Sequence, residues 1–150
     1  MVLLIFLTII DDHTRSTWTH LMTNKSQVSH IRKTFYHYIQ NQFQTSIKTT
    51  RSDNVSEFLG KKCISLFQQF NIVHQLSMPY TPQQNSVVER KHRHLLDTAR
   101  AIKIHANLPN SFWGECVLTA TYLINRMSTP VLAWKSPLNF YSTKYHPFII

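Results

Sequence analysis

Apolar residues occur along the chain both in short runs and at helical spacing, and the two patterns divide it into strands and helices. Apolar runs predict strands over residues 2–10, 17–22, 47–51 and 72–76. Helical spacing predicts helices over residues 28–39, 59–70, 86–105 and 112–127. Strands that come first and then alternate with helices indicate an α/β domain with a mixed sheet flanked by helices.

Polar segments separate these predicted strands and helices. Asp11 and Asp12 begin a turn between the first two strands, where their carboxylates are expected to cap the turn. Ser26 is expected to be the N-cap of the first helix. The segment 79–85 is predicted to be a loop before the longest helix, and the chain after Thr129 is predicted to be rich in loops.

The length and composition favour one folded domain. A chain of 150 residues, 43% of them hydrophobic, can build a core without metal or disulfide staples. Cys63 and Cys116 are too far apart for a CxxC zinc site and are expected to be reduced, buried thiols. The apolar segment 1–10 is too short to span a membrane and lacks a signal-peptide pattern, so it is expected to be a strand and the protein is expected to be intracellular.

Charge gives the first indication of function. Sixteen Lys and Arg against seven Asp and Glu give a formal net charge of +9. Such an excess favours a polyanionic partner, nucleic acid above all, although many basic proteins bind no such partner. Five cations lie on the long predicted helix: Arg90, Lys91, Arg93, Arg100 and Lys103. This helix suits a phosphate backbone, and the alternative is a solvated basic face.

Two of the few carboxylates are placed to meet. Asp53 follows a predicted strand, and Glu89 lies in the first turn of the long predicted helix. Carboxylate pairs of this kind hold Mg²⁺ or Mn²⁺ and support phosphoryl transfer. Two simpler roles stay open, in which Asp53 caps the following helix and Glu89 pairs with Arg93 one turn later.

Several longer motifs occur together, in one order. They are FLTIIDDHTR at 6–15, RSDN at 51–54 with EF at 57–58, PYTPQQN at 79–85, VERK at 88–91, ANLP at 106–109 with FWGE at 112–115, and YLINR at 122–126. Together they cover nearly the whole chain. The set resembles the integrase catalytic core of copia-type LTR retrotransposons.

The resemblance implies a ribonuclease H-like fold and a polynucleotidyl transferase that trims the 3′ ends of element DNA and joins them to target DNA. It implies an Asp, Asp, Glu triad with Mg²⁺ (or Mn²⁺), in which Asp53 matches the second member and Glu89 the third. It also implies multimers that act on DNA, with the nucleus as the expected location. The residues expected to contact DNA come from the loop and from the helix after it: Tyr80, Gln83, Gln84, Asn85, Arg90, Lys91 and Arg93.

The chain also departs from the family pattern. The first catalytic Asp, on the central first strand, and the zinc-binding module would both lie upstream of Met1. We therefore expect a core over residues 1–127 that is truncated at its N-terminus, followed by an extension over residues 128–150. Ser86 and the pair Val55-Ser56 stand where the family tends to have glycine, which is expected to stiffen the loop.

Three functions follow from this pattern. The first is an integrase core whose catalysis is impaired because one carboxylate is missing. The second is a non-catalytic nucleic-acid-binding module derived from a transposable element. The third is an active metal nuclease that uses only Asp53 and Glu89.

Overall fold

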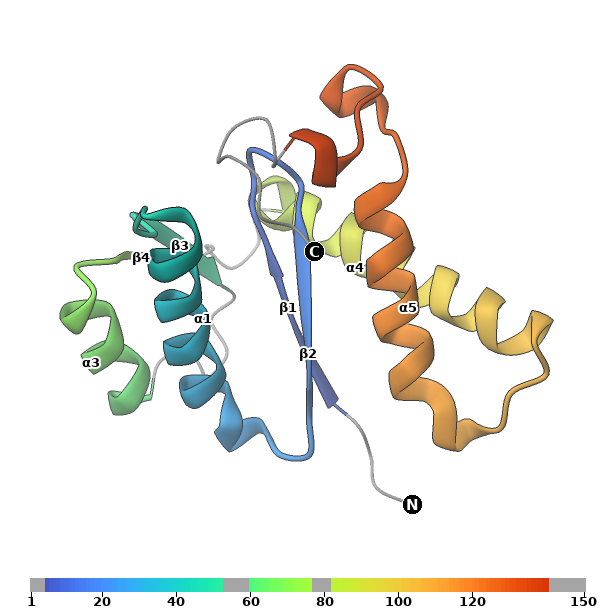
Figure 1. Ribbon diagram of the computed structural model, residues 1–150. Helices are drawn as coiled ribbons and strands as arrows, with labels where there is room; N and C mark the ends of the chain where they lie inside the picture. The colour runs from blue at the N-terminus through green and yellow to red at the C-terminus, as the bar shows by residue number, and fades with distance from the viewer. Residues whose placement is uncertain (1–4, 53–59, 77–81, 141–150) are drawn as a thin grey trace. The chain divides into compact units, whose positions relative to one another are not determined.

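The computed structural model describes residues 5–52, 60–76 and 82–140, with the side chains of residues 82–86 left out (Figure 1). The chain divides into two compact units, Met1–Leu21 with Val87–Ile150, and Met22–Ser86. The predicted order of strands and helices is confirmed, and so is the α/β class. The elements are β1 (Ile5–Ile10), β2 (Thr17–Met22), α1 (Val28–Phe43), β3 (Thr49–Ser52), α3 (Lys61–Gln69), β4 (Val73–Leu76), α4 (Pro82–His105) and α5 (Trp113–Arg126).

In the first unit, β1 and β2 pair through a tight turn. The Asp11 carboxylate accepts hydrogen bonds from the backbone N–H of His13 at 3.2 Å and from the hydroxyl of Thr14 at 2.6 Å. The backbone N–H of Asp11 donates to the carbonyl of Ser16 at 2.9 Å. Asp11 therefore caps the turn as predicted, whereas Asp12 instead pairs with the guanidinium of Arg15.

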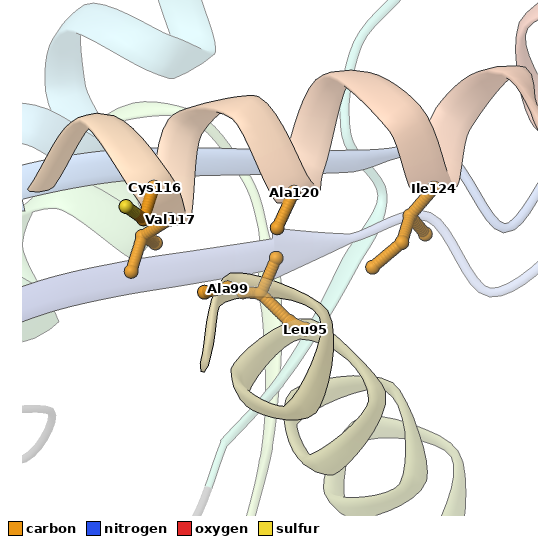
Figure 2. Close-up of a cluster of buried hydrophobic side chains, with 6 residues drawn as sticks. All are labelled: Leu95, Ala99, Cys116, Val117, Ala120 and Ile124. Atoms are coloured by element: carbon orange, nitrogen blue, oxygen red, sulfur yellow. The ribbon is translucent and has the colours of Figure 1, made fainter. Parts of the chain in front are cut away.

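The core of this unit lies where α4 meets α5. Figure 2 shows the α5 side chains directed at the helix below them. Leu95, Ala99, Val117 and Ala120 are all fully shielded from solvent. Two of the cluster members are alanines, and Phe6 of β1 packs against the same cluster. The helices thus hold the hairpin through apolar contact.

Polar side chains attach α5 to β2. The amide of Asn125 accepts from the backbone N–H of Thr17 at 2.9 Å and donates to the carbonyl of Thr17 at 2.7 Å. One turn earlier, the Thr121 hydroxyl donates to the Thr19 hydroxyl at 2.8 Å. These contacts join positions more than 100 residues apart and fix α5 against the hairpin.

The second unit contains a parallel strand pair. β3 pairs with β4 in the register Thr49↔Val73 to Ser52↔Leu76, with α3 as the crossover connection. α1 packs against α3, where the Arg32 guanidinium lies 4.6 Å from the centre of the Phe67 ring. This unit therefore has the strand–helix–strand arrangement that the alternation of patterns predicts.

Several local predictions need correction. Ser26 is not an N-cap, because Asn24 caps a short 3-10 helix (Lys25–Gln27) and Gln27 completes the capping box before α1. The residues of β1 are half-buried rather than buried. Beyond Thr129 the predicted loop contains a 3-10 helix (Pro130–Leu132) and a bridge between Thr129 and Lys135. Cys63 and Cys116 are reduced, buried cysteines, as predicted.

The strands of the described segments form two pairs, β1–β2 and β3–β4. Among the described helices, none is both long enough and apolar enough to cross a membrane.

Candidate functional site

Helix α4 displays the charged residues that the sequence singled out. It begins at Pro82, which fits a first helical position because proline lacks the N–H that this position leaves unbonded. Leu95 and Ala99 face the core, so the opposite side of the helix faces solvent. Glu89, Arg90 and Arg93 are all exposed there.

The charges at the start of α4 are not neutralised locally. Within the described segments, Glu89, Arg90 and Arg93 form no ion pair, so the alternative pairing of Glu89 with Arg93 does not occur. Further along the helix, Arg100 pairs with Asp97 at 3.1 Å. The N-terminal half of the exposed face thus keeps two guanidinium groups and one carboxylate for a ligand.

Lys91 differs from its neighbours because it is half-buried. Burial lowers the pKa of the Lys91 ammonium, and the positive charge of Arg15 lowers it further. The hairpin turn and α4 therefore bring two cations into mutual repulsion. Arg15 was not among the predicted DNA contacts, and its place beside Lys91 depends on how the hairpin packs on α4.

Other predicted site residues are only partly located. Asp53 and Tyr80 lie outside the described residues. Gln83, Gln84 and Asn85 belong to the first turns of α4, so the loop predicted over residues 79–85 is wrong from Pro82 onward. In the described part of the chain, no group of three or more His, Cys, Asp or Glu residues could hold a metal ion.

The end of β3 contains a contact that sequence reasoning missed. The Ser52 hydroxyl lies 2.8 Å from Nε2 of His74 on β4, and the His74 ring stacks on Phe67 with the ring centres 4.3 Å apart. Burial lowers the pKa of His74, and the nearby charge of Arg32 lowers it further. A neutral His74 thus joins the last residue of β3 to the neighbouring strand and to α3.

Comparison with known proteins places the chain in a family. A family model described as integrase core domain matches residues 3–82. The chain belongs to the integrase core family. It is 41% identical over 128 residues to the retrovirus-related Pol polyprotein from transposon RE1 of Arabidopsis thaliana, and 35% identical over 139 residues to that from transposon TNT 1-94 of Nicotiana tabacum. These matches cover 85% and 93% of the chain but only 9% and 10% of the two polyproteins.

Solved integrases share the fold of this integrase core. The catalytic core domain of HTLV-2 integrase, in complex with magnesium and in a trimeric form, matches with a TM-score of 0.68 and 14% identity over 91% of this chain and 84% of that one. The catalytic core domain of BIV integrase matches with a TM-score of 0.70 and 17% identity over 95% and 88%. The expected ribonuclease H-like fold is therefore confirmed.

Proposed function

We propose that this integrase core acts in DNA integration, in which the 3′ ends of element DNA are processed and joined to target DNA. The observation that carries the proposal is the exposure of Arg90 and Arg93 on α4 in a chain of this family. Arg90 and Arg93 there have no ion-pair partner in the described segments, in a chain with a net charge of +9. Guanidinium groups bind phosphate oxygens by charge-assisted hydrogen bonds, which suits a DNA backbone.

The finer proposal is that Asp53 and Glu89 bind Mg²⁺ or Mn²⁺. The Glu89 carboxylate is exposed and has no ion-pair partner among the described residues, so its donor chemistry fits a hard divalent cation. Asp53 supplies the second carboxylate by its match to the family motif. A bound ion of this kind would activate an attacking oxygen and stabilise a leaving one.

The residues around Glu89 hold the substrate in this proposal. Arg90 and Arg93 bind backbone phosphates, and Lys91 adds charge from a half-buried position. The segment that precedes these cations in sequence contacts the DNA end through Tyr80, Gln83, Gln84 and Asn85. Contacts to the backbone fix register and orientation, while they read no sequence.

We further propose that a protein made of these 150 residues alone processes and joins DNA weakly, because two carboxylates of the family's triad have counterparts in it. Such a chain binds DNA, works in the nucleus where its substrate is, and forms homo-oligomers on DNA ends. The polyproteins that it resembles are about ten times longer, so the activity of a full-length relative is a separate question.

The test compares binding with catalysis on one DNA. Labelled element-end DNA is incubated with the purified chain and Mn²⁺, and both affinity and strand transfer are measured. Glu89→Gln is expected to retain the affinity while it removes residual strand transfer. Robust wild-type strand transfer that Asp53→Asn abolishes would contradict impairment, and no DNA binding even at low salt would contradict the proposal as a whole.

The second candidate function is a non-catalytic nucleic-acid-binding module. It is favoured by the exposed Arg90 and Arg93, because guanidinium groups bind phosphate oxygens without a metal ion. It predicts sequence-independent binding, and it predicts no cleavage or joining with either Mg²⁺ or Mn²⁺. Calorimetry with Mn²⁺ distinguishes this module from a two-carboxylate nuclease. The nuclease requires that the wild-type chain binds Mn²⁺ and that Glu89→Gln weakens this binding.

A further inference from the structure

A hollow of about 380 Å³ lies beside the β1–β2 turn, within the first unit. The turn supplies one wall, and the segment after α5 supplies the other. Its volume is at the lower end of the range for ligand sites. The lining residues are Asp12, His13, Arg15, Val131, Leu132, Ala133, Lys135 and Phe140.

The two walls are held together by specific contacts. The Ser16 hydroxyl donates to the carbonyl of Pro137 at 3.4 Å, and the His13 ring meets the Phe140 ring edge-on with the centres 5.4 Å apart. On the far wall, the bridge between Thr129 and Lys135 closes a tight turn. The hollow is therefore a built feature of this unit.

The turn itself is fixed in an uncommon conformation. Arg15 has a φ of 59°, which is unusual for a residue other than glycine, and its backbone N–H donates to the carbonyl of Asp11 at 2.8 Å. Its side chain is 25% exposed. The backbone thus aims the Arg15 guanidinium into a partly shielded position where an ionic contact is stronger than on the open surface.

The charges around the hollow are predominantly positive. Arg15 and Lys135 are cations, His13 is a further nitrogen donor, and Asp12 is the one carboxylate of the lining. Asp12 is 76% exposed and is already paired with Arg15. An anion in the hollow would relieve this excess of positive charge.

From these observations we infer that the hollow is a phosphate-binding subsite for a DNA backbone, apart from the exposed start of α4. Arg15 and Lys135 bind the phosphate oxygens, His13 donates a hydrogen bond, and Val131 packs against the adjacent sugar. The inference rests on the proposed function, which it extends by a second contact region on the same unit. It predicts that bound DNA reaches the segment after α5.

Affinity at several salt concentrations tests the inference. Lys135→Gln is chosen because its side chain is exposed, whereas its backbone makes the contacts that shape the turn. It is expected to weaken DNA binding about five- to tenfold at 0.1 M salt and to lower the salt slope by about 0.9, equally for element-end and scrambled DNA. Lys33→Gln, an exposed lysine on α1, removes the same charge and is expected to leave both values unchanged.

Chemical footprinting then locates the contact. Bound DNA is expected to protect Lys135 from acylation, while Lys33 keeps reacting. DNA binding with no effect of Lys135→Gln and no protection of Lys135 would overturn the inference but leave the proposed function standing. Failure of the wild-type chain to bind DNA would instead defeat both. Protection of Lys135 by polyglutamate and not by DNA would overturn the inference in favour of an acidic protein partner.

Discussion

At the scale of single residues, the Asn125 amide substitutes for a strand partner of β2. It satisfies both the N–H and the C=O of Thr17, at 2.9 Å and 2.7 Å. Asn125→Ala leaves both backbone groups without this partner in a half-shielded place, so it is expected to lower the free energy of unfolding by about 1–3 kcal/mol. Urea denaturation measures the change.

The control for this prediction is Asn41→Ala on the exposed face of α1. Its effect is expected to stay within about 0.5 kcal/mol, as for other surface substitutions. Equal losses in the two variants would show that the Asn125 contacts contribute nothing particular.

We expect the folded protein to lose stability in acid because of His20 on β2. Burial lowers its pKa below the ordinary value of 6.5, and burial lowers the pKa of His74 as well. As the pH falls through 6.5, the unfolded chain therefore takes up protons that the folded protein does not. The stability that these neutral histidines allow is therefore fully present above pH 6.5, and it is lost as the pH falls toward their lowered pKa values.

The measurement for this prediction is urea denaturation at pH 7.5 and pH 5.5. His20→Gln is expected to reduce the loss of stability between the two, while His30→Gln, an exposed histidine on α1, retains it. A His20→Gln variant that loses as much stability in acid as the wild type would refute the assignment.

Residue-level predictions succeeded where the cause is local. The capping role of Asp11 follows from the neighbouring turn residues, and the hydrogen bonds from His13 and Thr14 confirm it. The roles of Asn125 and His74 could not be predicted, because their partners lie 108 and 22 positions away and only the folded chain brings them together. Arg15 was missed for the same reason.

At the scale of elements, periodicity located every described strand and α-helix but not every end, and it missed the short 3-10 helices. β2 and α5 agree closely with their predicted ranges, since turn residues bound them clearly. α4 starts four residues earlier than predicted, because proline is well suited to the first position of a helix. The Pro- and Gln-rich composition suggested a loop throughout.

We expect the contact between α4 and α5 to contribute strongly to the stability of the fold. Leu95 is 0% exposed in the cluster that joins the two helices, so Leu95→Ala opens a cavity among rigid neighbours. The expected loss is about 2–5 kcal/mol in the free energy of unfolding. Thermal or urea denaturation, followed by circular dichroism, measures it.

Leu118→Ala on α5 is the matched control, because this leucine is 42% exposed outside the cluster. It removes the same atoms and is expected to cost well under 1 kcal/mol. A large loss in Leu118→Ala with a small one in Leu95→Ala would contradict the assigned core.

At the scale of the whole molecule, family and fold were predictable because many motifs occur in one order over most of the chain. The geometry of the proposed metal site was not, and Asp53 lies outside the described residues. Two features of the proposed DNA-binding surface depend on packing rather than on sequence pattern. They are the half-buried Lys91 and the hollow beside Arg15.

The last prediction concerns whether DNA is attracted by net charge or by one surface. Arg90→Gln with Arg93→Gln removes two charges from α4, and Lys33→Gln with Lys62→Gln removes two from the exposed sides of α1 and α3. Both double variants have a formal net charge of +9 − 2 = +7. If α4 binds phosphates, the first variant lowers the salt slope by about 2 while the second leaves it near the wild-type value, because only contacts that displace counterions contribute to the slope. Fluorescence anisotropy between 50 and 200 mM salt measures both, and an equal decrease in the two slopes would show that overall charge, rather than α4, holds the DNA.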